Sequence, residues 1–235
     1  MMTLQEIDID FDFRLDSKGK DPDSSSPTMK AYHQLLWSKP LPNGQTMALT
    51  SEGCSYLRWN DMYFGSDSIT ASFRYMASLM EKVRGTMPDF DDFIEYYLGR
   101  AYTIGGEIIF PQLHWSMNQA RGCSPRIRDR WDLTLECIKR FYEGGHSPLD
   151  RALERSADFF RLFVDFKGYV DFFFLQDCVD EDYNVKLWLD TPLFEVNPIP
   201  KSIESYFDWI DAQLEFVAKR NERIAGYCKD SAITF

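Results

Sequence analysis

Residues 125–143 constrain the fold more than any other segment, because they predict a helix that is apolar on two nearly opposite sides. Ser124 followed by Pro125 is typical of a helix start, and the Gly144-Gly145 pair is typical of a helix end. At about 100° per residue, two apolar groups fall in separate sectors with a polar stripe between them. The first group is Trp131, Leu135, Ile138 and Tyr142, and the second is Leu133, Cys137 and Phe141. We therefore expect a core helix over about residues 125–143, at the centre of the protein.

Periodicity and helix-capping signals predict the remaining elements. A loop is expected over residues 111–123, and residues 168–179 are expected to be buried as either helix or strand. The pattern indicates an α+β fold class, a mainly helical single domain over residues 1–235 with short β-strands or hairpins. The expected helices cover residues 27–38, 68–84, 89–98, 148–163 and 202–225, and the expected strands cover residues 46–49, 55–59, 62–65, 107–110 and 185–189.

The N-terminal segment 7–13 alternates apolar and acidic residues and predicts a half-buried strand. Its carboxylates, Asp8, Asp10 and Asp12, would then share one face. Side chains two residues apart on a strand are ~6.6 Å apart, too far to hold one cation without further ligands. A solvated acidic face is the expected role of these residues.

The charge balance excludes two classes of partner. The chain has 37 acidic and 26 basic residues, a formal net charge of −11. Non-specific nucleic-acid binding and anionic membrane surfaces both require clustered Lys and Arg, so we expect neither partner. No basic and apolar leader opens the chain, and no apolar run approaches the ~18 residues of a membrane span. Five scattered cysteines predict neither a zinc site nor a disulfide framework, and the expected localisation is cytoplasmic.

Arginines gather where the 111–123 loop meets the predicted core helix. Helix N-termini present free N–H groups to anions, and a buried guanidinium needs a partner. We predict an anion-binding site for a phosphate or carboxylate here, formed by Asn118, Arg121, Arg126 and Arg130. The alternative is an internal network in which these arginines bind the protein's own carboxylates, and the sequence leaves both open.

Three side chains are candidates for acid–base catalysis. His33 and His114 can titrate near neutral pH, and Glu107 follows the Gly105-Gly106 pair. A structural or surface histidine is the alternative for each. The histidine spacing matches no metal motif, so no metal site is predicted, and no glycine group matches a nucleotide fingerprint. The sequence therefore names no cofactor.

Four longer motifs are similar to an uncharacterised bacterial protein family, a domain of unknown function. They read SPTxxxYHxLLWSKPLP from Ser26, YTIGGxxxFP from Tyr102, NQARG from Asn118 and IRDRxDLTLECI from Ile127, where the unmarked position is Trp131. The resemblance covers most of the chain and implies a bacterial or phage setting. It implies no catalytic residue, because the family has no assigned activity.

Two functional hypotheses follow. In the first, the chain is an intracellular enzyme or ligand-binding domain that holds an anionic small molecule, such as a nucleotide, at the 118–130 junction. In the second, it is an acidic protein–protein interaction module, a regulator, inhibitor or immunity-type protein, whose partner is a basic protein. Whether the protein is an enzyme is left open by the sequence.

Overall fold

The computed structural model describes residues 2–51, 56–70, 75–112 and 115–231. A small antiparallel sheet of three strands, ordered β1–β2–β3, lies at one end of it. The strands are β1 (Leu57–Trp59), β2 (Met62–Ser68) and β3 (Glu107–Pro111). The turn between β1 and β2 has Asn60 at a φ of 52°, a left-handed conformation that asparagine tolerates. The register pairs Ser68 with Glu107 across β2 and β3, which brings the polar ends of these strands together.

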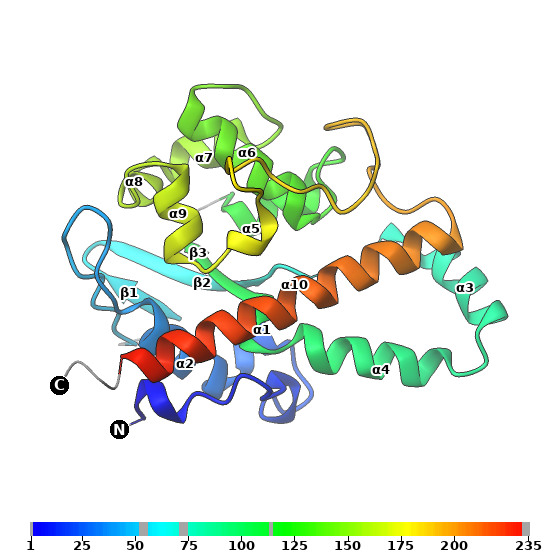
Figure 1. Ribbon diagram of the computed structural model, residues 1–235, viewed down its shortest axis with the longest axis horizontal. Helices are drawn as coiled ribbons and strands as arrows, with labels where there is room; N and C mark the ends of the chain where they lie inside the picture. Colours follow the sequence, from blue (N-terminus) through cyan, green and yellow to red (C-terminus); the bar gives the residue numbers. More distant parts are fainter. Residues whose placement is uncertain (1, 52–55, 71–74, 113–114, 232–235) are drawn as a thin grey trace.

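Helices form most of the described chain, and this confirms the predicted mainly helical α+β class. In Figure 1, α5 to α9 lie on one side of the long helix α10, and α1, α2 and the N-terminal segment lie on the other. The helices are α1 (Pro22–Ser25), α2 (Pro27–Trp37), α3 (Ala77–Thr86), α4 (Phe90–Ala101), α5 (Met117–Cys123), α6 (Trp131–Glu143), α7 (Asp150–Arg155), α8 (Ala157–Arg161), α9 (Phe166–Phe172) and α10 (Ile203–Asp230); the 3₁₀ turns are η1 (Leu4–Glu6), η2 (Phe13–Leu15), η4 (Ile104–Gly106) and η5 (Gln176–Cys178).

Helix α10 crosses the whole molecule and contacts α3 and α4 near its start and η4, η5 and η1 further along (Figure 1). It runs beyond the predicted end at Ala225, because Gly226 does not stop it. No atom lies within 4 Å of a Cβ built on Gly226, so the glycine is only a weak point in a helix held by packing of Ile224 and Cys228. A large core surrounds the sheet and the middle of the chain, and a second core joins α3, α4 and the first half of α10.

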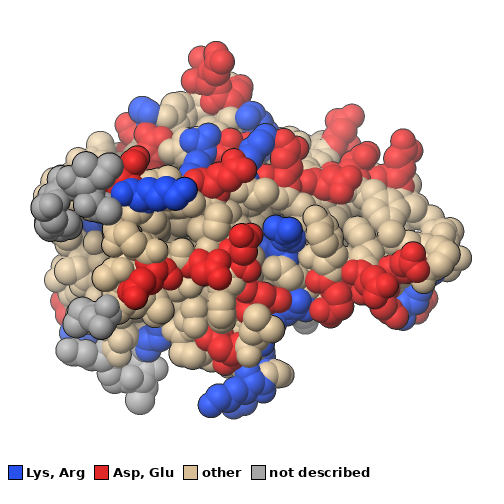
Figure 2. Space-filling view, turned by 60° about the horizontal axis from the view of Figure 1, so that its bottom comes forward, with Lys and Arg blue, Asp and Glu red and all other residues tan. Residues whose placement is uncertain are grey.

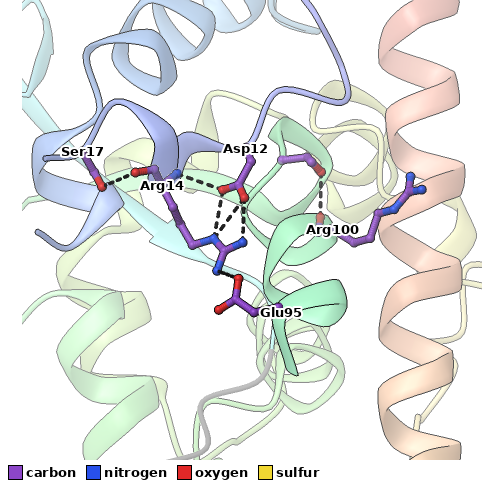
Figure 3. A network of polar contacts seen from close by, with 6 residues as sticks. Asp12, Arg14, Ser17, Glu95 and Arg100 are labelled. Atoms are coloured by element: carbon purple, nitrogen blue, oxygen red, sulfur yellow. Dashed lines mark hydrogen bonds and ion pairs between the residues drawn. The ribbon is translucent and has the colours of Figure 1, made fainter. Parts of the chain in front are cut away.

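The predicted strand over residues 7–13 is wrong. Asp8 accepts the N–H of Asp10 at 3.0 Å and Asp12 accepts the N–H of Arg14 at 2.9 Å, so short side chains replace ladder hydrogen bonds with local turns. Arg14 bridges Asp12 and Glu95 of α4, which ties this segment to the helix (Figure 3). The three aspartates therefore share no strand face.

The predicted core helix is confirmed as a two-sided buried helix but begins at Trp131 rather than Pro125. Arg128 and Asp129 have positive φ angles of 52° and 61°, which no α-helix accommodates. The helix ends at Gly144, whose φ of 72° forms a left-handed C-cap. Residues 111–123, expected as a loop, contain helix α5, and the undecided 168–179 segment is helical in α9 and η5. The predicted 148–163 helix is split at Ser156 into α7 and α8.

Candidate functional site

Three carboxyl groups from distant parts of the chain meet at the polar end of the sheet. Glu107 begins β3 and is fully buried, and Asp67 lies beside it near the end of β2. Asp23 comes from α1, which packs on β2. Among the described residues, both carboxyl oxygens of Glu107 and Oδ1 of Asp23 are buried, and no N–H or O–H group other than a protonated carboxyl of the pair itself donates to them. This arrangement is costly unless at least one carboxyl carries a proton.

Burial dominates the titration of all three carboxyl groups. It raises the pKa of Glu107 well above its usual range, and the neighbouring Asp23 carboxyl raises it further by repulsion and by a shared hydrogen bond. Burial also raises the pKa of Asp23. The pKa of Asp67 rises to about 7 even though the Arg121 guanidinium opposes the shift. The directions of these shifts favour a proton shared between Asp23 and Glu107, with Glu107 as the donor.

Asp23 is the member of the pair that reaches open space, because it lines two neighbouring cavities. The larger, which we name the α1 cavity, has a volume of about 590 Å³. Its lining is mostly hydroxyl and amide groups, including Ser26, Tyr56, Ser66, Gln112 and Asn118. The smaller, of about 380 Å³, has an acidic lining of Asp21, Asp23, Asp67 and Asp129. Glu107 lies behind Asp23 and lines neither cavity.

His33 contacts this site only through Tyr56. The Nδ1 atom of His33 is 2.9 Å from the Tyr56 hydroxyl, and Tyr56 lines the α1 cavity. Burial lowers the pKa of His33 to about 3, with a smaller contribution from the charge of Arg220, so the imidazole is neutral. Burial also raises the pKa of Tyr56 well above its usual range. The imidazole thus fixes the position of the Tyr56 hydroxyl at the cavity wall, whereas His33 itself does not line the cavity.

Comparison with known proteins places the chain in a family. A family model described as a family of unknown function (DUF6994) matches residues 7–224. The chain belongs to the DUF6994 family. No curated protein and no solved structure matches the DUF6994 chain significantly.

The arginines of the predicted anion site in this DUF6994 protein bind internal groups. Arg121 is fully buried; it pairs with Asp67 and donates to the Thr134 hydroxyl at 3.0 Å and to the Asp129 carbonyl at 3.1 Å. Arg130 pairs with Asp132 and donates to the Pro198 carbonyl at 2.9 Å. These contacts favour the internal-network alternative, and anion binding stays a prediction.

Of the remaining predicted site residues, Asn118 lies at the α1 cavity and Arg126 lies away from it. Asn118 lines the α1 cavity and donates from Nδ2 to the Ser66 carbonyl at 2.8 Å. Arg126 is exposed and donates to the Phe194 carbonyl at 2.8 Å, in a different part of the molecule. His114 lies outside the described residues. The structure thus brings Glu107 and Asn118 to the site, with Arg121 reaching it through its pair with Asp67 and His33 through Tyr56.

The sequence reasoning missed Asp23, Asp67 and Tyr56. Asp23 lies in a stretch that reads as a polar loop, where a carboxylate attracts no notice. Asp67 offered one usable signal, because aspartate is depleted in strands and its presence beside Ser66 and Ser68 marks a polar strand end. No local pattern links these residues with Glu107, which only the tertiary fold brings close.

Within the described ranges, no group of three or more His, Cys, Asp or Glu side chains is arranged to hold a metal ion. None of the described helices has the length and apolarity needed to cross a membrane.

Proposed function

We propose that this DUF6994 protein is an enzyme that binds a small, uncharged or amine-bearing polar molecule in the α1 cavity and acts on it by acid–base chemistry. The observation that carries the proposal is Glu107, which is fully buried with neither carboxyl oxygen accepting from a described donor, directly behind Asp23. A structural carboxylate would be paired, as Asp132 is with Arg130. A carboxyl pair with one shared proton is a common acid–base device.

The pair divides the chemistry between its members. Asp23 faces the cavity, where it can take a proton from a bound hydroxyl or return one to a leaving group. Glu107 holds the shared proton behind it, which keeps the net charge of the pair near −1, while burial raises the pKa of Asp23 above its usual range. Tyr56, Ser66 and Asn118 supply hydrogen-bonding groups that can orient hydroxyls or amides of the ligand.

The cavity disfavours the anionic ligand that the sequence suggested. Its lining contains one cationic side chain, Lys30, and the Asp23 carboxyl stands opposite any added negative charge. The arginines that would hold a phosphate are bound to Asp67 and Asp132 instead. Hydroxyls, amides and a carboxyl are the groups that recognise sugars, nucleosides and amino sugars.

A thermal-shift screen tests the proposal. Neutral sugars, nucleosides and amino sugars are compared with their phosphorylated forms, on the wild type, Asp23→Asn and Asp61→Asn. The last is a matched control in the exposed β1–β2 turn. A ligand at 100 times its Kd stabilises by about 2.7 kcal/mol, or roughly 5–11 °C for a domain of this size. We expect such a shift in the wild type and Asp61→Asn but not in Asp23→Asn.

Two results would contradict this function. If only phosphorylated compounds raise the melting temperature, and Arg121→Ala abolishes the shift while staying folded, the anion site at the 118–130 junction is correct instead. If ligands of the neutral class shift wild type and Asp23→Asn equally, the α1 cavity is not where they bind.

The acidic surface favours a second candidate, the interaction module. Figure 2 shows acidic side chains along two edges of the narrow end, where α4 and α10 run, with uncharged residues between them. The exposed carboxylates include Asp91, Asp92 and Glu95 on α4 and Glu204, Asp208 and Asp211 on α10. A basic protein partner would bind these edges and dissociate as salt rises. Recovery of the same partner at low and high salt would contradict an electrostatic interface.

A further inference from the structure

A third cavity, lined by other segments than those of the carboxyl pair, has a lysine in its wall. It has a volume of about 610 Å³ and lies between the 39–42 segment, α9 and the end of α10. Most of its lining is apolar, including Leu41, Pro42, Phe163 and Phe174, and we name it the Lys39 cavity. Lys39 is only 8% exposed, which is unusual for a lysine.

Aromatic rings surround the amine of Lys39. Its Nζ lies 3.7 Å from the ring centre of Phe174, 4.6 Å from Phe172, 4.9 Å from Tyr227 and 5.1 Å from Trp37. These ring faces attract an ammonium ion, but they replace neither water nor a carboxylate as hydrogen-bond acceptors. Within the described part of the chain, no carboxylate pairs with this amine.

Both carboxylates among the described residues that line the Lys39 cavity are bound to other groups. Asp171 is bound by Lys167 at 2.9 Å and by the Tyr183 hydroxyl at 3.2 Å. Asp165 caps α9 by accepting the N–H of Gly168 at 2.7 Å. The amine of Lys39 is therefore left with aromatic faces and the cavity as its surroundings.

The four rings around the Lys39 amine form a cage, and the positive charge of Arg220 lies near one of them, where it disfavours the ammonium form of Lys39. The Arg220 guanidinium carbon lies 5.8 Å from the Trp37 ring. Burial, and after it the charge of Arg220, lowers the pKa of Lys39 well below its usual range. The neighbouring Cys228 thiol contributes little negative charge, because burial raises its pKa to about 11. A lower pKa increases the share of the neutral amine, which is the nucleophilic form, at a given pH.

The four rings surround the amine of Lys39, and backbone contacts hold the segment that carries it. The Lys39 carbonyl accepts the N–H of Met47 at 3.2 Å, and Pro40 follows directly. Across the cavity, a Cβ built on Gly168 would lie 2.1 Å from the Phe163 carbonyl oxygen, so this side of the wall also tolerates little movement. A preorganised amine beside an apolar cavity has the layout of a covalent site.

We propose that Lys39 is a nucleophilic lysine that forms an imine with an apolar aldehyde or ketone bound in the Lys39 cavity. The Nζ lone pair attacks the carbonyl carbon, and the carbonyl oxygen takes up a proton as the amine loses one, which gives a carbinolamine. Loss of the hydroxyl with a second proton from nitrogen releases one water molecule and leaves the C=N bond. No oxidant or reductant is needed for these steps.

Reductive trapping on the wild-type protein tests this site. The folded chain is incubated near pH 7 with benzaldehyde and cyanoborohydride, and each lysine is then quantified by peptide mass mapping. Lys167 is the matched control, because it lines the same cavity but is paired with Asp171 and Tyr183, contacts that raise its pKa. Each unit of pKa difference gives about tenfold more neutral amine, so we expect Lys39 to be labelled at least tenfold faster than Lys167.

The labelling rates in the unfolded chain and in the Lys39→Met variant show whether the preference for Lys39 depends on the folded site. In urea the preference for Lys39 should vanish, and in Lys39→Met the remaining lysines should be labelled at unchanged rates. If Lys39 is unlabelled in the folded protein, or is labelled no faster than Lys167, the proposal is overturned and the cage is a packing feature only. The wild-type map is sufficient should Lys39→Met fail to fold.

Discussion

Replacing Arg130 with methionine should separate an internal ion pair from an anion-binding site. In the structure, Arg130 and Asp132 are both buried, with 0% and 1% of their side chains exposed. The arginine also donates from Nη1 to the Thr191 hydroxyl and the Pro198 carbonyl, each at 2.9 Å. Asp132 in turn accepts the backbone N–H of Trp188 at 2.9 Å. The pair therefore fastens the 188–198 segment to the start of α6.

The magnitude follows from this geometry. Arg130→Met leaves the Asp132 carboxylate buried without its counter-charge, and breaking one side of a buried pair costs about 3–5 kcal/mol. In a domain of this size, that loss lowers the melting temperature by roughly 6–20 °C. Adding Asp132→Asn removes the stranded charge and keeps an amide oxygen for Trp188. The double variant should therefore be more stable than Arg130→Met by about 1 kcal/mol or more.

Urea unfolding followed by tryptophan fluorescence measures these differences. Arg126→Met is the matched control, because Arg126 is exposed and makes one hydrogen bond to a carbonyl, so its loss should cost no more than about 0.5 kcal/mol. The reasoning is refuted if Arg130→Met unfolds at the same urea concentration as Arg126→Met. It is also refuted if the double variant is less stable than Arg130→Met.

Three further predictions concern the carboxyl site and its support. The pKa of His33 falls from 6.5 to about 3 on folding, so between these values only the unfolded chain takes up this proton, and lowering the pH from 6.5 to 4.5 should reduce the free energy of unfolding by up to about 2.7 kcal/mol. Urea titrations of His33→Gln should lack this dependence of stability on pH. An equal dependence in the wild type and the variant would contradict the prediction. The raised pKa of Glu107 makes stability depend on pH in the opposite direction, because here the folded chain holds the proton that the unfolded chain releases. The wild type should therefore lose stability relative to Glu107→Gln as the pH rises above about 4.5, and parallel stability profiles of the two proteins would rule this out. Gly106→Ala should lower the free energy of unfolding by about 1–3 kcal/mol or more, as measured by thermal unfolding, because its Cβ would lie 1.8 Å from the Ala101 carbonyl oxygen. Gly226→Ala is the contrasting variant: its Cβ would have open space around it, so the free energy of unfolding should rise by about 0.5–1 kcal/mol.

Local signals predicted the elements whose ends are capped by their own residues. Ser26 accepts the N–H of Met29 at 3.1 Å and Pro27 occupies the first turn of α2, as the cap-plus-proline pattern indicates. The two-sided apolar pattern of α6 correctly predicted a buried helix. The same cap pattern failed at Pro125, because Asp129 adopts a left-handed conformation and offers its carbonyl to Arg121. Tertiary hydrogen bonding there outweighs the local capping preference.

The candidate site was only partly predictable, because its chemistry depends on burial. Glu107 could be singled out from its position after two glycines, but its proton depends on Asp23, which lies in a distant segment. Lys39 stands within one of the family-like motifs, yet nothing in the sequence indicates that four rings from three segments enclose it. Charged residues look alike in sequence whether solvated or buried, and this distinction decides their pKa values.

Arg220 links the two proposed sites through one buried charge. The apolar face of α10 was readable from sequence, but Arg220 lies fully buried within it and donates to the backbone carbonyls of Gly105 at 2.9 Å and Glu107 at 2.8 Å. These partners are carbonyls, so the guanidinium keeps a positive field that no paired carboxylate cancels. After burial, that field is the second cause that lowers the pKa of both His33 and Lys39. Burial is the larger cause of both shifts, and the one buried arginine adds to it at both places.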